Sequence, residues 1–447
     1  MLAYNLRIAW KSLRRNPWLT AIIVGGIALG ICASTTFTTV RHMYLRDPLP
    51  GKSQKLFYVR LDDWDVSRPY PNDGRTNRRG VPPQITYRDA IELWRSKIPV
   101  RQTMGFRSNA IVYPDRTVSR PYTEAVRFCT ADFFPMFELP FQFGHPWDHR
   151  ADDKGEQVAV IDDTTNQKLF AGANSVGKTL RVKNLNFTIV GVLAPFHPFY
   201  VYYDPVSAPV QPDHIFLPFH CAINTESWNS FKSDSPAWAI GPVPNTGRGS
   251  VYLERLYAEN NIIQYWLELR SPADAAAFQR FADDYVTGQK KFGRFPRPLN
   301  NVIMPMRDAW IDRGFIQPQV HAMAAISILF LVICALNLTG LVLAKFLARA
   351  PEISVRRALG ASRAAIFLQH VVECELAGLA GGVIGIALSA GVLRFIGKLV
   401  ATQGHILRFD LEMIAVAIFL SLGAGLLAGL YPAWRVCRVQ PAVQLKL

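Results

Sequence analysis

The sequence is poor in charge and in cysteine for its length. Only 19% of its 447 residues are charged, whereas 50% are hydrophobic. This composition excludes an intrinsically disordered chain and a collagen-like fibre. The six cysteines are too few for a disulfide framework, and no two of them form a Cys-x-x-Cys pair. The length alone indicates two or three domains.

The apolar residues gather in four long runs that contain no charged residue. These runs cover residues 19–40, 322–344, 376–393 and 413–434. An α-helix needs about 20 apolar residues to cross the hydrocarbon core of a bilayer, which is about 30 Å thick. The third run is at the short limit, and we expect it to continue upstream through residues 366–372. The pattern predicts four membrane-spanning helices.

Positive charge is concentrated beside these runs. The formal net charge is +15, and loops rich in Lys and Arg remain on the cytoplasmic side of a membrane. Both termini and the segment between runs two and three are therefore predicted to be cytoplasmic, and binding to nucleic acid loses its main support. The basic residues on this side are Arg7, Lys11, Arg14, Arg15, Lys345, Arg349, Arg356, Arg357, Arg363, Arg435, Arg438 and Lys446.

We predict an α-helical membrane protein with four transmembrane helices and a large mixed α/β extracytoplasmic domain inserted between helices 1 and 2. A cleaved signal peptide in place of helix 1 is disfavoured, because such peptides have an apolar run of only about 7–15 residues. The predicted segments are an interfacial helix (1–18), helix 1 (19–42), the extracytoplasmic domain (43–319), helix 2 (320–345), a cytoplasmic loop or helix (346–369), helix 3 (370–394), a short loop (395–411), helix 4 (412–434) and a cytoplasmic tail (435–447).

The large inserted segment has the pattern of two α/β subdomains. Residues 195–250 are rich in Pro, Tyr, Trp and Gly and are predicted to be an irregular insertion or second subdomain. Aromatic residues there, such as Tyr202 and Tyr203, either pack in the core, which we favour, or form a ligand face. Periodicity predicts strands at 56–60, 157–161, 179–182, 187–192 and 262–270, and helices at 86–96 and 273–285.

Residues 172–179, Gly-Ala-Asn-Ser-Val-Gly-Lys-Thr, match the phosphate-loop pattern GxxxxGK[ST]. Such a loop binds phosphate when it opens a helix whose N-terminal amides face the anion. Here residues 179–182 are predicted to continue as a strand, on the side of the membrane that lacks ATP. We interpret the motif as a glycine-containing turn into a hairpin rather than a nucleotide site.

The inserted segment carries no recognisable catalytic motif. His145 and His149 lie four residues apart in a proline-containing stretch without the HExxH context of a zinc site, so exposed histidines are favoured over metal ligands. Cys129 and Cys221 are the cysteines of this segment. In an oxidising compartment they form either a disulfide or two buried thiols.

Several motifs together resemble one known family. They are Pro-Glu-Ile-Ser-Val-Arg-Arg-Ala-Leu-Gly-Ala-Ser-Arg at 351–363, Gly-Lys-Thr-Leu at 177–180, Phe-Thr-Ile-Val-Gly-Val-Leu at 187–193, Tyr-Pro-Ala-Trp-Arg at 431–435 and Gln-Pro-Ala at 440–442. The chain resembles the FtsX/MacB-type, or type VII, ABC transporter permeases. The resemblance covers nearly the whole chain and is weakest at 195–260.

The resemblance implies that the loop between helices 2 and 3 contacts an ATPase. Arg356 and Arg357 would then pair with acidic groups of that subunit, and Gly360 would permit a turn. The alternative is a basic helix that lies on anionic lipid. The implied coupling residues are Glu352, Arg356, Arg357, Leu359, Gly360, Ala361, Ser362 and Arg363.

Two polar residues fall within predicted spans. Glu373 corresponds to a glutamate of the family's third span, and a charge at that depth costs at least about 2.5–3.5 kcal/mol. It either pairs with Lys345 or with a partner subunit, or extends to the headgroups. Asn337 falls where relatives carry an asparagine late in span two.

The family also implies how the chain works. MacB carries an ATPase domain before its first span, whereas only residues 1–18 precede span one here. We therefore expect no cofactor in this chain, with ATP and Mg²⁺ on separate ATPase subunits. Further expected partners are a second permease copy in a homo- or heterodimer, a periplasmic adaptor, an outer-membrane channel and membrane lipids.

The expected function is export from the bacterial inner membrane, driven by movement of the periplasmic domain. The substrate would be a small molecule, a peptide or a lipid-linked compound. Two alternatives remain open. One is FtsX-like control of a cell-wall hydrolase, although those proteins have smaller outer loops, and the other is lipoprotein release of the LolC/LolE type.

Overall fold

The computed structural model describes residues 2–66, 80–114, 120–196, 201–206, 212–224, 238–239, 260–312, 318–399 and 411–438. The chain divides into two compact units: Met1–Arg46 with Gln317–Leu447, called the membrane unit here, and Asp47–Ile316, called the sheet unit. Much of the predicted insertion at 195–250, most of the predicted loop at 395–411 and the 440–442 motif lie outside the described residues.

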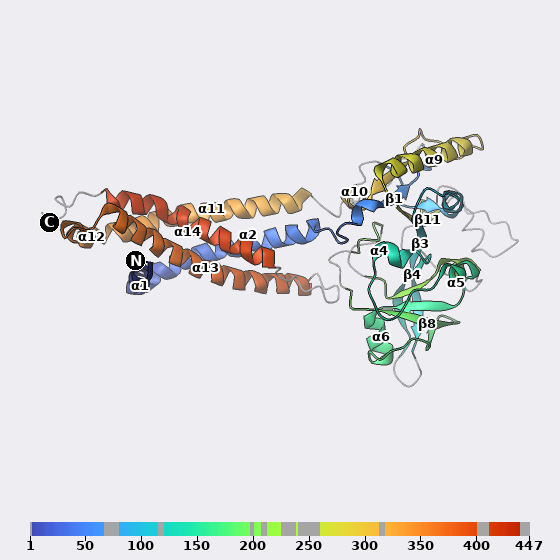
Figure 1. Cartoon of the computed structure of the whole chain (residues 1–447), viewed down its shortest axis with the longest axis horizontal. Coiled ribbons are helices and arrows are strands. Elements are labelled where there is room, and N and C mark those ends of the chain that lie inside the picture. Colours follow the sequence, from blue (N-terminus) through green and yellow to red (C-terminus); the bar gives the residue numbers. More distant parts are fainter. Residues whose placement is uncertain are drawn as a thin grey trace. The chain divides into compact units, whose positions relative to one another are not determined.

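The membrane unit is built from helices (Figure 1). Four of them are long and apolar enough to cross a membrane, which confirms the four predicted spans. The third span begins earlier than predicted. Helix α13 runs without a break from Arg363 into the apolar run, so it includes residues 363–369, which were predicted as part of the cytoplasmic loop or helix. The helices are α1 (Leu2–Arg15), α2 (Pro17–Leu45), α11 (Pro318–Leu347), α12 (Ala350–Ala358), α13 (Arg363–Leu399) and α14 (Leu411–Cys437).

Glycine allows the spans to approach closely. Helix α2 packs against α11 and α13, and α14 packs against the same two helices. A Cβ atom placed on Gly381 or Gly385 of α13 would lie 2.8 Å from Ile27 or Ile31 of α2. Small residues at such crossings favour helix association in lipid. A hydrogen bond of 2.8 Å between the Thr36 and Ser389 hydroxyls adds a polar contact between α2 and α13.

The sheet unit is organised around a mixed sheet of 12 strands in the order β12-β1-β11-β3-β4-β9-β6-β8-β5, with β2 and β10 paired to β11, and β7 paired to β3 and β8. Pairs β4–β9 and β6–β8 are parallel. The strands are β1 (Leu56–Arg60), β2 (Ile85–Thr86), β3 (Arg101–Tyr113), β4 (Tyr122–Cys129), β5 (Phe141–Gly144), β6 (Val158–Ile161), β7 (Thr179–Val182), β8 (Leu185–Leu193), β9 (Ile215–Pro218), β10 (Trp238–Ala239), β11 (Asn260–Glu268) and β12 (Val302–Pro305).

Short helices connect these strands (Figure 1). Side-chain caps fix where several of them start: Thr86, Asp148, Asp162 and Ser271 each accept a hydrogen bond from a backbone N–H three residues later. The helices are the 3₁₀ turn η1 (Ser53–Lys55), α3 (Tyr87–Trp94), α4 (Phe133–Phe137), α5 (His149–Lys154), α6 (Asp163–Phe170), α7 (Phe219–Asn224), α9 (Pro272–Lys290) and α10 (Met306–Asp312).

Both faces of the central strands are covered. Phe128 of β4 and Tyr265 of β11 belong to the main hydrophobic core, to which α3 and α9 also contribute. Their neighbours Arg127, Gln264 and Trp266 are also buried. Because side chains alternate along a strand, these three residues lie on the opposite face. The sheet therefore separates an apolar layer from a layer with polar and aromatic side chains.

The sequence-predicted elements of this unit are present. The strand predicted at 56–60 is β1, and the strand predicted at 179–182 is β7. The phosphate-loop lookalike is thus a turn that leads into a strand, as predicted. Gly172 and Gly177 have φ of 78° and 85°, a region that suits glycine. The Lys178 ammonium lies 5.0 Å from the centroid of the Phe170 ring.

Cys129 and Cys221 are both buried thiols that form no disulfide with one another. Of the two alternatives that the sequence left open, the structure has the two buried thiols. Cys221 belongs to the same core as Phe128. Cys129 is the next residue of β4, so its side chain points to the other face of the sheet.

Tyr202 and Tyr203 pack in the interior, as favoured from the sequence. Their exposed fractions are 2% and 1%. Both rings lie within about 6 Å of Phe137, and Tyr203 also contacts Phe133 edge-on at 5.1 Å. The Tyr202 hydroxyl donates a hydrogen bond of 2.8 Å to the Phe137 carbonyl. These two aromatic residues therefore belong to the core of the sheet unit.

Candidate functional site

The basic segment after α11 folds as a short helix with one buried side. Pro351 lies in the first turn of α12, where its missing N–H costs no hydrogen bond. Ile353 and Ser354 are buried, whereas Val355 and Arg356 are exposed. The exposed side of α12 therefore combines apolar and basic groups.

A turn of fixed geometry follows α12. Gly360 has φ of 99°, a conformation that side chains with a Cβ rarely adopt, so the predicted turn at Gly360 is confirmed. Leu359 beside it is 84% exposed. Ala361 is half-buried and Ser362 is exposed. The Ser362 hydroxyl accepts a hydrogen bond of 3.2 Å from the Ala365 N–H, which caps α13 where it begins at Arg363.

Three contacts hold α12 to other helices of the membrane unit. Glu352 accepts a hydrogen bond of 2.6 Å from the Arg15 guanidinium of α1, and this contact lowers the pKa of Glu352. Arg356 donates to Gln369 of α13 at 3.3 Å. Arg357 donates to the Cys437 carbonyl of α14 at 3.4 Å. Helix α12 thus contacts three neighbours through its polar side chains.

A buried ion pair joins α11 to α13. The Lys345 Nζ lies 2.6 Å from the Glu373 Oε1, and each side chain is 3% exposed. Ser12 of α1 donates a hydrogen bond to the same carboxylate oxygen and accepts one from the Arg349 guanidinium. Arg349 also donates to the Ser12 carbonyl at 3.2 Å and lies 3.7 Å from the Glu373 Oε1. The pairing of Glu373 with Lys345 is confirmed, and Ser12 and Arg349 join it.

This group of Ser12, Lys345, Arg349 and Glu373, called the polar cluster here, was only partly visible in the sequence. Arg349 could be read as one more basic residue of a cytoplasmic loop, and Ser12 gave no signal. Ser12 and Arg349 share one partner, the Glu373 carboxylate, which is buried away from water. Charges buried together stay stable when each is paired and hydrogen-bonded, and these contacts supply that condition. The cluster therefore fixes α1, α11 and α13 to one another.

Asn337 does not belong to this cluster. It lies on α11 and is exposed on the surface of the membrane unit. Arg363 is also exposed, although its carbonyl accepts a weak contact of 3.7 Å from the Cys437 thiol. The structure therefore brings Glu352, Arg356 and Arg357 together on α12 and places Asn337 apart from them.

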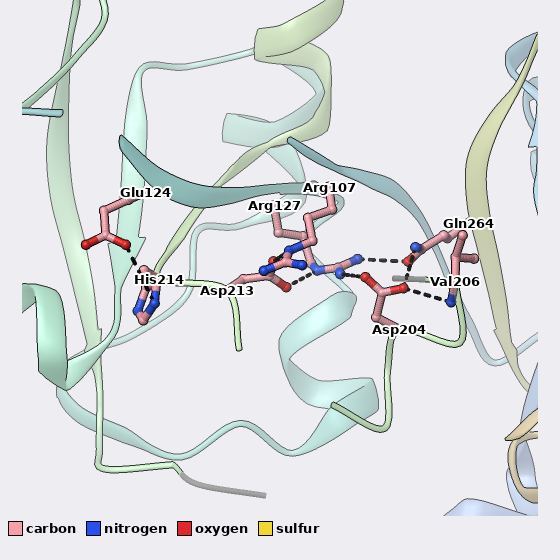
Figure 2. Close-up of polar contacts among 8 residues, drawn as sticks. All are labelled: Arg107, Glu124, Arg127, Asp204, Val206, Asp213, His214 and Gln264. Atoms are coloured by element: carbon pink, nitrogen blue, oxygen red, sulfur yellow. Dashed lines mark hydrogen bonds and ion pairs between the residues drawn. The ribbon is translucent and has the colours of Figure 1, made fainter. Parts of the chain in front are cut away.

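A second polar group lies inside the sheet unit (Figure 2). Arg127 of β4 donates to Asp213, Asp204 and Gln264, and is 2% exposed. Arg107 of β3 donates to the other oxygen of Asp213 at 2.8 Å. Five side chains, from strands β3, β4 and β11 and from the connection between β8 and β9, are thereby joined. Such a network, with each charge paired, braces the polar face of the sheet.

His214 lies at one end of this region, beside Glu124 (Figure 2). Its Nδ1 lies 2.8 Å from Asp162, the cap of α6, and its Nε2 lies 3.6 Å from Glu124 of β4. Glu124 also pairs with Lys168 of α6. Burial lowers the pKa of His214, but the hydrogen bond and charge of Asp162 and the charge of Glu124 outweigh burial, so this pKa is raised above its ordinary value.

We predict that Glu373→Gln destabilises the membrane unit more than the double variant Lys345→Met/Glu373→Gln does. The single variant leaves a buried ammonium without its counter-ion, which costs about 3–5 kcal/mol in buried pairs, whereas the double variant removes both charges. The measurement is the thermal unfolding midpoint of the purified chain in nanodiscs. Glu352→Gln, which breaks an exposed pair worth about 0–1 kcal/mol, is the control. Equal midpoints for the single and double variants would contradict the role of the pair.

We predict that His214→Gln destabilises the sheet unit mainly at acidic pH. A raised pKa in the folded state means that the stabilisation is complete below the ordinary value of 6.5 and is lost as the pH rises through the raised value. The expected loss at acidic pH is about 1.5–3 kcal/mol, the range for hydrogen bonds to charged groups.

The measurement is urea unfolding of a 41–321 fragment, which we expect to fold alone because it holds its own core. Circular dichroism checks that folding first. His149→Gln is the control, because His149 is 69% exposed and 3.4 Å from its carboxylate partner. A stability loss that is the same at acidic and alkaline pH would show that His214 is not charged in the fold.

Comparison with known proteins places both units in one family. Residues 20–283 match the model of the MacB-like periplasmic core domain, which is more than half of the chain, and residues 324–441 match the FtsX-like permease C-terminal model. A macrolide export ATP-binding/permease protein MacB of Burkholderia lata is 27% identical over 313 residues, covering 69% of this chain and 39% of that protein. The pyoverdine export ATP-binding/permease protein PvdT of Pseudomonas aeruginosa is 23% identical over 445 residues, covering 98% and 58%.

The chain thus spans about two fifths to three fifths of these relatives. Among solved structures, the periplasmic region of MacB from Actinobacillus actinomycetemcomitans matches 61% of this chain and 99% of its own, with 13% identity and a TM-score of 0.37. The extracellular domain of YknZ from Gram-positive bacteria matches with 9% identity and a TM-score of 0.34, covering 56% of this chain and 99% of that domain. On the two family models, the chain belongs to the FtsX/MacB-type family of ABC transporter permeases.

Proposed function

We propose that this chain is the transmembrane subunit of an ABC transporter in the bacterial inner membrane. In this proposal both termini are cytoplasmic, the sheet unit is periplasmic, and ATP with Mg²⁺ binds to partner ATPase subunits. Family membership supports the permease role. The concentration of Lys and Arg in the segments around α1 and α12 supports the orientation, because cytoplasmic loops carry such an excess.

The exposed side of α12 and its turn carries this proposal. Val355, Arg356 and Leu359 are exposed there, and Leu359 is 84% exposed. The turn at Gly360 leaves Leu359 exposed, next to the Arg356 guanidinium. This combination suits a partner surface that has an apolar recess and a carboxylate. We assign this surface to contact with the ATPase. A helix made only to lie on lipid would gain nothing from the fixed turn at Gly360.

The contacts inside the membrane unit provide a route from that surface to the spans. Glu352 ties α12 to Arg15 of α1, and Ser12 of the same helix is bound to Glu373 of α13. A push on α12 would therefore act on α1 and α13 together. We propose that this movement, rather than passage of substrate between the spans, drives the periplasmic unit.

Export is the activity we propose. The names of the relatives describe export of macrolides and of pyoverdine, which favours export over control of a cell-wall hydrolase or lipoprotein release. The substrate class is a small molecule, a peptide or a lipid-linked compound. A second permease copy, a periplasmic adaptor and an outer-membrane channel complete the proposed assembly.

We predict that reversing Arg356 and Arg357 to Glu together releases the ATPase or uncouples hydrolysis from export. Each charge-assisted contact is worth roughly 1.5–3 kcal/mol, and reversal replaces attraction by repulsion. The measurement is recovery of the partner ATPase subunit when the tagged permease is purified from membranes, followed by transport.

Two checks keep the result specific. Membrane insertion of the variant is compared with that of the wild type, because reversed charge near a span can disturb topology. Reversal of Arg150 and Arg280, which are exposed on the sheet unit, gives the same charge change away from α12 and should leave recovery unchanged. Normal ATPase recovery together with normal transport in the Arg356/Arg357 variant would rule out this coupling surface.

A further inference from the structure

Glu375 is an acidic residue of α13 that does not belong to the polar cluster. It follows Glu373 by two positions, which places it on a different side of the helix. Its stem is partly exposed, but both carboxyl oxygens are buried and have no hydrogen-bond partner among the described residues. It lies two residues inside Glu373, toward the long apolar part of the span.

The carboxyl group of Glu375 rests against α14 at a glycine. A Cβ atom placed on Gly425 would lie 3.2 Å from the Glu375 Oε1, so the bare backbone of Gly425 makes room for the acid. Close to it, Cβ atoms on Gly378 or Gly382 of α13 would meet Ser421 of α14 at 3.0 Å or less. The acid is thus held in a tight, glycine-lined contact between two spans.

The helices packed on α13 offer this carboxyl no counter-ion. Helix α14 has no charged residue between Glu412 and Arg435, and α2 has none from residue 19 to residue 40. Lys345 of α11 pairs with Glu373. Ser12 of α1 and Arg349, which directly precedes α12, also contact Glu373.

An ionised carboxylate without a partner is strongly unfavourable in such a place. Burial of an isolated charge costs far more than burial of the neutral acid, so an unpaired group changes its protonation state instead. An ionised acidic residue within a spanning helix is unfavourable on every insertion scale. We propose that Glu375 is a proton-binding site, occupied by a proton whenever α13 and α14 are packed as they are in this structure.

The proposal links helix packing to proton binding. When the contact between α13 and Gly425 opens and water reaches the carboxyl, the acid releases its proton to water and becomes a carboxylate. When the contact closes, the carboxylate takes the proton back. This consequence for a transport cycle rests on the proposed function, whereas the protonation state of the resting protein does not.

The test is infrared spectroscopy of the full chain in nanodiscs at neutral pH, with wild type and Glu375→Gln compared by subtraction. The expected difference is the loss of one carbonyl band of a protonated carboxylic acid, with no loss in the carboxylate bands. Glu156→Gln is the matched control, because Glu156 is 47% exposed on the sheet unit, and it should lose carboxylate bands only.

Loss of carboxylate bands in Glu375→Gln would overturn the proposal, because it would show that Glu375 is ionised and paired. A protonated band that stays unchanged in Glu375→Gln would overturn it as well. The measurement needs no reagent to reach the buried group and no ATPase. Its outcome is therefore independent of whether Arg356 and Arg357 bind the ATPase.

Discussion

The membrane unit depends on one carboxylate that has been removed from water. The Glu373 side chain is 3% exposed, and it is contacted by Lys345 of α11, by Ser12 of α1 and by Arg349 of the turn between α11 and α12. Each of these partners is in turn held by the carboxylate, since moving any of them alone would leave a buried charge unpaired. The positions of α1, α11 and α13 at this level are therefore determined together. A purely hydrophobic contact would let the helices slide past one another. The charge-assisted hydrogen bonds of this cluster are directional and join specific atoms.

The sheet unit follows the same rule in a different setting. Arg127 lies within a strand of apolar residues, yet it is buried beside Asp204, Asp213 and Gln264. With only 19% of its residues charged, the chain still places several of its charges inside. These charges do not solvate a surface. They define which connecting segments can lie on the second face of the sheet, because no apolar residue at position 127 could bind two aspartates at once.

The sequence predicted the apolar spans, several strands and the turn at Gly360, because each depends on a local pattern of a few residues. It also offered Lys345 as the partner of Glu373, because Lys345 ends the second predicted span and Glu373 lies near the start of the third. It gave no sign of Ser12, which lies 361 positions away in the chain. The same limit applies to the cysteines: alternation along β4 directs Cys129 away from the core that contains Cys221 of α7, and the sequence alone could not place that helix on one face of the sheet.

Glycine and the polar cluster have opposite mechanical effects within the same span. Along most of α13 the contacts to α2 and α14 pass through Gly381, Gly385 and Gly425, which bring backbones close without fixing a direction of movement. Near its N-terminal end, α13 is instead bound through Glu373 to charged and hydroxyl groups. In the function proposed above, a force that enters at α12 would meet a stiff, specific connection first and a smooth helix contact afterwards. This order suits a span that transmits a movement along its length, because the end that receives the force does not slip and the remainder offers little resistance to sliding.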